Sequence, residues 1–466
     1  MWTGIGIALY ILIAISIVVS LLLNGIRPSK TLAWLLAIFT IPVGGILLYL
    51  MVGRNRRKQK VYTQRTRLPE TPPPGSQPGA PALSKRMDQI RTLIEKHAGF
   101  PLSTDNDLEL LKDGEKTFYR IFEALQEAEE SIHVQYYIFE EGKLADRLLE
   151  LFVQKEASGV EVRLIYDSIG SLSLSRGYLK RLRDAGIEVH NFLPYRFGKF
   201  LTSLNYRNHR KIIVVDGKTA FTGGINISDK YMKGDRHLGM WHDMHLMVRG
   251  QAAHQLDAVF INDWELVSGK RLEIKAPVYK GTPGNNRVQI LATGPDDDYP
   301  LMEQLYFSLI NSARKHLYIT NPYIIPSHAI MTALHTAALS GVDVRLMVSA
   351  QADSAVVTWC VQSYFQRFLK AGIRIFLYPE GFLHSKIITV DDAMCTIGTA
   401  NVDDRSFQHN YEVNAVIYES AFARQLRKYF EADSDTSIEL DYETFRQRPW
   451  RHRLAEGAAR TISPLL

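Results

Sequence analysis

The chain contains His209-Arg-Lys211-Ile-Ile-Val-Val-Asp216 and, further on, His384-Ser-Lys386-Ile-Ile-Thr-Val-Asp391. Both stretches follow the pattern His-x-Lys-x4-Asp. Each is followed, at the same spacing, by a glycine-led run that ends in asparagine: Gly223-Gly-Ile-Asn226 and Gly398-Thr-Ala-Asn401. A single match of this kind would carry little weight, but two matches in register indicate two copies of one functional unit.

The segments before these motifs repeat as well. Ser158-Gly-Val-Glu-Val-Arg-Leu-Ile165 returns as Ser340-Gly-Val-Asp-Val-Arg-Leu-Met347, and Ala185-Gly-Ile-Glu-Val189 returns as Ala371-Gly-Ile-Arg-Ile375. The strand-like run 132–139 corresponds to 317–325. The order of the pieces is the same in both copies, at offsets of 182 to 186 residues. The sequence therefore predicts a duplicated body.

Helical and strand patterns alternate within each copy. In the first copy, apolar spacing predicts helices over 116–130, 142–158 and 178–185, and strands over 132–139, 160–167 and 187–192. Such alternation is typical of an α/β fold with a mixed sheet covered on both faces. We therefore expect two α/β/α repeats, related by a pseudo-two-fold axis.

The isoleucines and valines after each histidine predict a buried β-strand. Side chains two residues apart on a strand share a face, so each histidine and the lysine of its motif are expected to point the same way. Asp216 and Asp391 lie an odd number of residues from their histidines. We count them with the catalytic motif, in a supporting role such as pairing a buried charge.

Two imidazoles and two ammonium groups around one space would suit phosphoryl transfer. That reaction needs a nucleophile, an acid for the leaving oxygen and cationic groups for the non-bridging oxygens. Histidine supplies the first two near neutral pH. Lysine and asparagine can supply the third, so neither a metal nor another cofactor is expected.

The first 60 residues differ in character from the body. No ionisable side chain occurs over 1–26, and a second uncharged stretch covers 31–53. Each stretch is long enough for a transmembrane helix, and the turn over 24–30 between them predicts a helical hairpin. The seven basic residues within 54–67 predict, by the positive-inside rule, that the body faces the cytoplasm. They also suit anionic headgroups on that leaflet.

The charge distribution argues against nucleic acid as a partner. The formal net charge is +6, but the strip over 54–67 contributes seven positive charges and Arg27 and Lys30 contribute two more. Residues 68–466 are therefore left with a net charge of −3. Polyanion binding needs positive charge on the binding body itself. The two cysteines exclude a disulfide framework.

The paired motif resembles the phospholipase D superfamily. The run 205–211, the Gly-Gly-Ile-Asn stretch and the apolar hairpin before a Pro-rich segment make the chain similar to the bacterial cardiolipin synthases of that superfamily. The resemblance implies transfer of a phosphatidyl group between two phosphatidylglycerols, giving cardiolipin and glycerol, without nucleotide or metal. It also implies a multi-pass protein of the bacterial cytoplasmic membrane, with phosphatidylglycerol and other anionic lipids as partners.

The same resemblance assigns roles to residues. It implies that one histidine forms a phosphatidyl-histidine and the other acts as acid and base, with His209 favoured as nucleophile and His384 as acid/base. Residues expected to hold the phosphoryl oxygens are Lys211, Lys386, Asn226 and Asn401. An acid is implied behind each histidine, and Asp243 and Glu412 are the candidates. Either acid could instead be structural.

Three other functions stay open on the sequence alone: a hydrolytic phospholipase D that releases phosphatidic acid, a membrane-tethered nuclease and an inactive scaffold. The predicted organisation is a transmembrane hairpin with a basic strip over 1–60 and a Pro-rich linker over 61–86. The two repeats are expected over 87–280 and 281–466. The apolar segment 197–204 is equally consistent with lipid entry and with the core. Oligomeric state and acyl-chain preference are not predicted.

Overall fold

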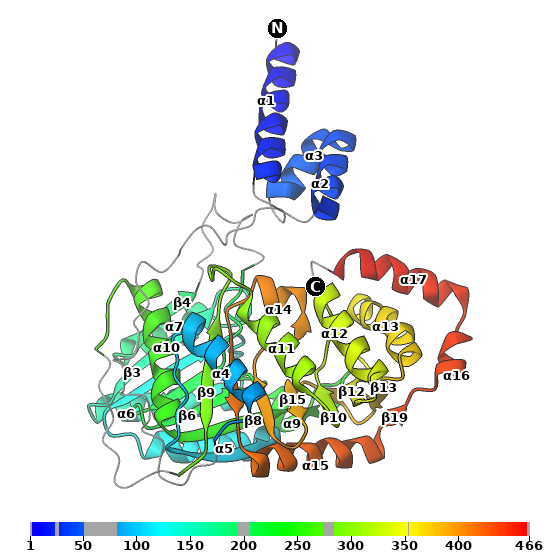
Figure 1. Ribbon diagram of the computed structural model, residues 1–466. Coiled ribbons are helices and arrows are strands. Elements are labelled where there is room, and N and C mark those ends of the chain that lie inside the picture. The colour runs from blue at the N-terminus through cyan, green and yellow to red at the C-terminus, as the bar shows by residue number, and fades with distance from the viewer. Residues whose placement is uncertain are drawn as a thin grey trace. The chain divides into compact units, whose positions relative to one another are not determined.

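The computed structural model describes residues 2–23, 28–50, 82–192, 206–273, 284–352 and 354–463. The chain divides into two compact units, an N-terminal unit and a large body, which are described separately (Figure 1). The basic strip over 54–67, most of the expected linker over 61–86 and the apolar segment 197–204 lie outside the described residues.

The described part of the N-terminal unit consists of three helices: α1 (Trp2–Leu23), α2 (Pro28–Thr40) and α3 (Pro42–Leu48). The second apolar stretch is thus divided near Pro42, which lacks the N–H that would continue a helix. Ile17, Leu21 and Ile38 form part of a small core. None of the helices among the described residues has both the length and the apolar character needed to cross a membrane. The expected transmembrane hairpin is therefore not supported by these elements.

The first half of the body is a sheet of seven strands with helices packed against it. Its strands are β1 (Asn106–Lys112), β2 (Ser131–Tyr136), β3 (Glu161–Asp167), β4 (Glu188–Phe192), β5 (Ile212–Val215), β6 (Thr219–Gly223) and β8 (Met244–Gly250). Its helices are α5 (Asp113–Gln126), α6 (Lys143–Ala157), α7 (Arg176–Asp184), α9 (Lys230–Lys233) and α10 (Gln251–Ser268). The helices and strands predicted for this half are confirmed, with small shifts at their ends.

The second half contains a sheet of eight strands. They are β9 (Val288–Thr293), β10 (His316–Thr320), β12 (Asp343–Ser349), β13 (Arg374–Tyr378), β15 (Ile387–Val390), β16 (Met394–Gly398), β18 (Glu412–Ile417) and β19 (Ile438–Glu439). The helices are α11 (Leu301–Ser312), α12 (His328–Leu339), α13 (Ala355–Lys370), α14 (Asp404–Gln408), α15 (Ser420–Thr436), α16 (Tyr442–Arg446) and α17 (Trp450–Thr461).

The two sheets have the same topology. The first runs β1-β8-β6-β5-β2-β3-β4 and the second β9-β18-β16-β15-β10-β12-β13, with β19 added at the far edge. In both, the first five strands pair antiparallel, while β2-β3-β4 and β10-β12-β13 pair parallel. The mixed α/β fold and the duplication predicted from sequence are confirmed.

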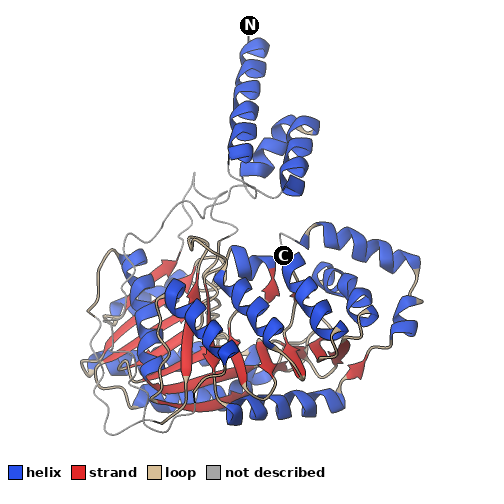
Figure 2. Cartoon of the chain, viewed as in Figure 1, coloured by secondary structure: helices blue, strands red, loops and turns tan. Residues whose placement is uncertain are grey.

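Helices cover the outer faces and the two sheets share an inner core (Figure 2). The helices α5, α6 and α7 pack on the first sheet, and α11, α12 and α13 pack on the second. Between the sheets, buried residues of both halves, such as Val214 and Ile397, form one cluster with α10 and α15. This shared core places the two copies of the motif in one continuous body.

Helix α4 (Lys85–Ala98) precedes the first sheet in sequence but packs with the second half. Its buried Ile90 and Ile94 belong to the same cluster as Leu291 and Leu305. The helix begins after Ser84, whose hydroxyl accepts a hydrogen bond from the Met87 N–H. The structure therefore differs from the predicted boundary at residue 87, because the apolar face of this helix is buried on the later repeat.

Candidate functional site

Each motif histidine is held in place by an extended segment from the opposite half. His209 and His384 lie in extended segments just before β5 and β15. The backbone N–H of His384 donates to the carbonyl of His242 (2.8 Å), where β14 (Phe382–Leu383) pairs with β7 (Trp241–His242). Reciprocally, the N–H of His209 donates to the carbonyl of Tyr411 (2.9 Å). These exchanged contacts are what a pseudo-two-fold arrangement of the halves produces.

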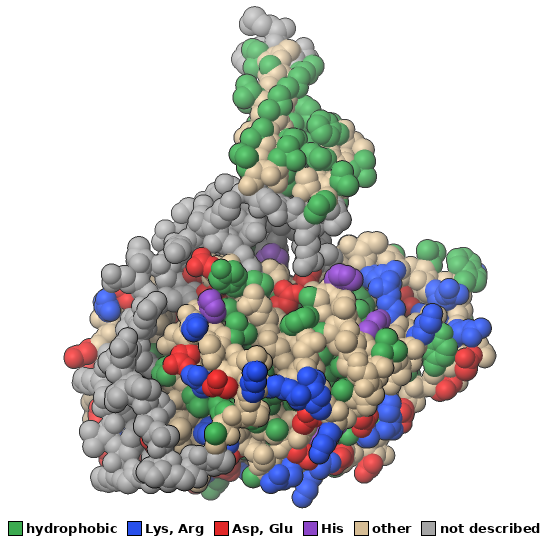
Figure 3. Space-filling view, in the orientation of Figure 1, with side chains coloured by type: hydrophobic (Ala, Val, Ile, Leu, Met, Phe, Trp, Pro, Cys, Tyr) green, Lys and Arg blue, Asp and Glu red, His purple; other side chains and the backbone are tan. Residues whose placement is uncertain are grey.

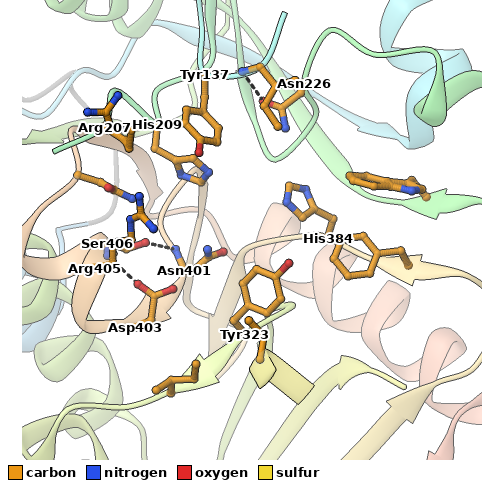
Figure 4. Close-up of a pocket in the computed structure, with 16 residues that line it drawn as sticks. Tyr137, Arg207, His209, Asn226, Tyr323, His384, Asn401, Asp403, Arg405 and Ser406 are labelled. Atoms are coloured by element: carbon orange, nitrogen blue, oxygen red, sulfur yellow. Dashed lines mark hydrogen bonds between the residues drawn. The ribbon is translucent and has the colours of Figure 1, made fainter. Parts of the chain in front are cut away.

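Both imidazoles open into one cavity of about 330 Å³. His209 and His384 point toward each other across it, with Asn226 and Asn401 also on its wall (Figure 4). The structure thus brings together four of the predicted site residues that lie up to 192 positions apart in the sequence. A cavity of this size holds a polar headgroup rather than whole acyl chains.

The two candidate acids are paired crosswise with the histidines. The Nδ1 atom of His209 lies 3.0 and 3.1 Å from the two carboxylate oxygens of Glu412. The Nδ1 atom of His384 lies 2.8 Å from a carboxylate oxygen of Asp243. Both carboxylates are fully buried. Each acid therefore orients the histidine of the other half and leaves its Nε2 atom free of that contact.

The pairing sets the protonation states of the site. Burial lowers the pKa of His209 to about 4, and Glu412 only partly offsets this. Burial likewise lowers the pKa of His384 to about 3. Burial raises the pKa of Glu412, but the combined effects of His209, Lys211 and Thr399 outweigh burial and bring this pKa to about 2. At neutral pH each histidine is therefore an uncharged imidazole that donates from Nδ1 to a carboxylate and carries a lone pair on Nε2.

The two lysines complete a buried cluster of compensating charges. The ammonium of Lys211 donates to the carbonyl of His209 (2.8 Å), and Lys386 makes the same contact with His384. Burial lowers the pKa of Lys211 to about 7, with a further contribution from Lys386, whose own pKa falls to about 8. Two lysines and two carboxylates balance in charge. An entering phosphodiester would therefore add negative charge that the ammonium groups can stabilise.

The two asparagines occupy corresponding places but make different contacts. The side-chain oxygen of Asn226 accepts from the Ile138 N–H (3.3 Å), and its amide nitrogen donates to the Tyr231 hydroxyl (3.4 Å). The side-chain oxygen of Asn401 is buried and finds no hydrogen-bond partner within the described ranges. In the same part of the chain, no cluster of three or more His, Cys, Asp or Glu side chains is arranged to hold a metal.

The cavity has a cationic side and an aromatic side. Arg405 and the buried Asp403 lie on the side of His209 (Figure 4). Within the described part of the chain, the Arg405 guanidinium forms no ion pair with an acid within 4.0 Å. On the other side, the rings of Trp241 and Phe382 lie 5.5 and 5.6 Å from the ring of His384. An anionic group and an apolar group could thus be accommodated at opposite ends of one site.

Comparison with known proteins agrees with this geometry. The family described as "Cardiolipin synthase, PLD-like domain" matches residues 121–264 and 306–434, and "Phospholipase_D-nuclease N-terminal" matches 6–54. Cardiolipin synthase of Geobacillus kaustophilus is 39% identical over 97% of this chain and 92% of its own length. That of Halalkalibacterium halodurans is 38% identical over 100% and 95%. The chain belongs to the phospholipase D-like cardiolipin synthases.

A solved structure supports the fold independently of close sequence similarity. Phosphatidylserine synthase of Haemophilus influenzae Rd KW20 superimposes with a TM-score of 0.63 at 15% identity, covering 81% of this chain and all of that one. The duplicated α/β body is therefore shared with a distant protein.

Besides Arg405 and the aromatic side chains of the cavity, two residues that contact the histidine–acid pairs were not predicted from the sequence. The buried hydroxyl of Tyr231 lies 3.1 Å from the Nδ1 atom of His384, and Thr399 donates to Glu412 (2.6 Å). Tyr231 lies outside the repeated motif, and Thr399 lies inside the run 398–401 at a position where the two copies differ. Tyr231 comes from the short helix α9, and Thr399 takes the place that Gly224 has in the first half. The pattern that reveals a duplication cannot reveal the positions at which the two copies differ.

The structure corrects the grouping of Asp216 and Asp391 with the catalytic residues. The carboxylate of Asp216 accepts from the backbone N–H groups of residues 129–131. That of Asp391 accepts from residues 314–316. Both residues have a positive φ, near 53° and 52°. They fix the turn that ends the motif strand and satisfy the backbone there, so they pair with N–H groups rather than with a buried charge.

Proposed function

We propose that the protein transfers a phosphatidyl group from one phosphatidylglycerol to another, giving cardiolipin and glycerol. The observation that carries the proposal is the pair of uncharged imidazoles in one cavity, each oriented by a carboxylate of the other half. The family assignment supports the same substrates. Both steps can be written with the residues that line this cavity and the buried lysines and carboxylates next to them.

In the first step, Nε2 of His209 attacks phosphorus and the bond from phosphorus to the glycerol oxygen breaks. His384 supplies a proton to that oxygen, and glycerol leaves. Before this step the Nε2 atom of His384 takes up a proton from solvent, because the bound phosphodiester places a negative charge beside an imidazole whose Nδ1–H faces Asp243, and so raises the pKa of His384. The product of this step is a phosphatidyl-histidine.

In the second step, the primary hydroxyl of another phosphatidylglycerol attacks the same phosphorus. His384 takes the hydroxyl proton, and the bond from phosphorus to His209 breaks. Lys211 and Lys386, with Asn226 and Asn401, would stabilise the non-bridging oxygens in both transition states. Proton loss and proton gain at His384 balance over the cycle.

The N-terminal unit supports a membrane location, which we include in the proposal. Large apolar side chains are exposed along its helices, among them Leu12 at 69% and Val43 at 71%. Contiguous exposed apolar surface marks contact with lipid or protein. Together with the basic strip after it, this favours attachment to the bacterial cytoplasmic membrane with the body on the cytoplasmic side. Alkaline extraction of membranes from producing cells tests this: release of the chain would contradict it.

The decisive test of the reaction is the purified full chain in phosphatidylglycerol vesicles with no other substrate. Cardiolipin and glycerol are expected in equal amounts, and neither His209→Ala nor His384→Ala should form them. Phosphatidic acid and glycerol without cardiolipin would mean that water is the acceptor, and the proposed transfer would be wrong. If no phospholipid turns over, the phospholipase D chemistry itself fails.

A further inference from the structure

A second cavity, of about 340 Å³, lies away from the histidines between α13 and α17. Its lining is strongly cationic. The charged side chains around it are Arg367, Lys370, Arg448, Arg453 and Arg460, with Glu456 as the single acid. These residues carry a net charge of +4 on a body whose residues 68–466 sum to −3.

The single acid is already neutralised. Both carboxylate oxygens of buried Glu456 accept from the Arg448 guanidinium, at 2.7 and 2.6 Å. Arg448 is further held by Gln366 (3.2 Å). Among the described residues, the other four cations form no ion pair with an acid. Arg448 and Glu456 therefore build the wall of the cavity, while four positive charges face an opening with no internal counter-charge.

We propose that this cavity binds the phosphate of an anionic phospholipid headgroup. Guanidinium groups match phosphate oxygens in geometry and form strong charge-assisted hydrogen bonds with them. Like charges gathered without an acid repel one another, and a bound phosphate relieves that repulsion. None of its described lining residues lines the catalytic cavity, and none of them is a histidine or a cysteine.

The surface beside the cavity favours a lipid over a soluble phosphate. Helix α17 exposes Trp450 at 67% and Leu454 at 64%, four residues apart on one face. Exposed tryptophan and leucine beside arginine are typical of helices that lie in the membrane interface. On the face shown in Figure 3, basic and hydrophobic side chains gather together where α16 and α17 lie in Figure 1. Helix α17 would thus contact the lipid headgroup through its arginines and the membrane interface through Trp450 and Leu454.

A fluorescent probe at position 454 tests the proposal in the full chain. Leu454→Cys introduces an exposed thiol, whereas Cys360 and Cys395 are buried, so an environment-sensitive label reacts selectively. The labelled protein is reconstituted into phosphatidylcholine vesicles with 0 to about 30 mol% phosphatidylglycerol. Emission is expected to increase severalfold and shift to the blue as the anionic lipid is added.

Gly457 provides the matched variants. It lines the cavity, and a Cβ atom there would meet no other atom within 4 Å. Gly457→Glu places a carboxylate among the arginines without removing any contact, while Gly457→Gln adds the same bulk without charge. We expect the glutamate to reduce the probe response at least fivefold and the glutamine to reduce it less than twofold. Folding is monitored by circular dichroism, and Arg367→Gln/Arg460→Gln gives an independent loss of charge.

Three results would overturn the proposal. Equal emission with and without phosphatidylglycerol would mean that α17 contacts lipid through its apolar face alone. Equal losses in the glutamate and glutamine variants would mean that bulk, not charge, matters. Competition by millimolar inorganic phosphate at constant ionic strength would identify a soluble anion as the occupant. None of these readouts depends on catalysis, so they are independent of the proposed transfer reaction.

Discussion

Replacing Asp243 by asparagine should affect a different chemical step from replacing Glu412 by glutamine. Asp243 orients His384, and Glu412 orients His209. If His209 is the nucleophile and His384 the acid, Glu412→Gln slows attack on phosphorus whatever the leaving group. Asp243→Asn slows only the departure of a poor leaving group such as glycerol, because p-nitrophenol leaves without needing a proton.

The size of the effect follows from the contacts. A hydrogen bond to a charged group contributes about 1.5–3 kcal/mol, and each 1.36 kcal/mol is a factor of ten in rate. Each substitution is thus expected to slow the step of its histidine by about 10- to 150-fold. Glu412→Gln should lie at the upper end, because Thr399 and Asn410 also donate to this carboxylate, at 2.6 and 3.1 Å.

Single-turnover measurements with two donors check the prediction. With phosphatidylglycerol, both variants should release glycerol slowly. With phosphatidyl-p-nitrophenol, Asp243→Asn should release nitrophenol within threefold of the wild-type rate, while Glu412→Gln remains slow. Asp216→Asn is the matched control, since the hydrogen bonds of its carboxylate to described residues all come from backbone N–H groups at the far end of the strand. Slow nitrophenol release by Asp243→Asn, with normal release by Glu412→Gln, would reverse the assigned roles.

Three further predictions concern Arg405, the two lysines of the site and His242. Arg405→Gln should reduce the rate of cardiolipin formation at least tenfold, because the second anionic lipid needs this guanidinium. The rate at which labelled glycerol exchanges into phosphatidylglycerol should change less than threefold. Equal losses in both rates would place Arg405 in the donor step. The wild-type kcat/KM should fall as pH rises from 7 to 9, since the pKa of Lys211 is about 7 and that of Lys386 about 8; a flat profile would contradict the role of charged lysines. His242, held by Asp113 and Asp433 against the opposing effect of burial, has a pKa raised to about 9. Its contribution to the free energy of unfolding is therefore complete below pH 6.5 and is lost as the pH rises through 9. In urea denaturation, His242→Gln should lower the free energy of unfolding by about 3 kcal/mol at pH 6 and by much less at pH 10.

The duplicated α/β body could be predicted because its evidence is local and repeated. Apolar spacing within each segment identified the helices and strands of the first half, and the same order of segments at offsets of 182 to 186 residues identified the second copy. The membrane hairpin was predicted from composition by the same local reasoning. There, none of the described helices has both the length and the apolar character of a membrane span. The second apolar stretch is divided, because α2 ends at Thr40 and α3 starts at Pro42.

The candidate acids show where local evidence ends. Asp243 and Glu412 were identified by their place in the family pattern, but which histidine each one faces depends on how the two sheets pack. The alternation of side chains along a strand placed Asp216 on the face opposite His209. It could not show that the Asp216 carboxylate accepts hydrogen bonds from three backbone N–H groups. Tyr231 carried no pattern at all, because it belongs to a part of the repeat in which the two copies differ.

The sequence by itself determined that the chain is a duplication with two His-Lys motifs, because periodicity and spacing are properties of neighbouring residues. Only the tertiary structure decided that each histidine is oriented by the opposite half, and that five cations between positions 367 and 460 surround one cavity. A summed charge of −3 over residues 68–466 hides that cavity. Net charge records how many ionic groups a chain has, whereas their energies depend on the distances that folding sets between them.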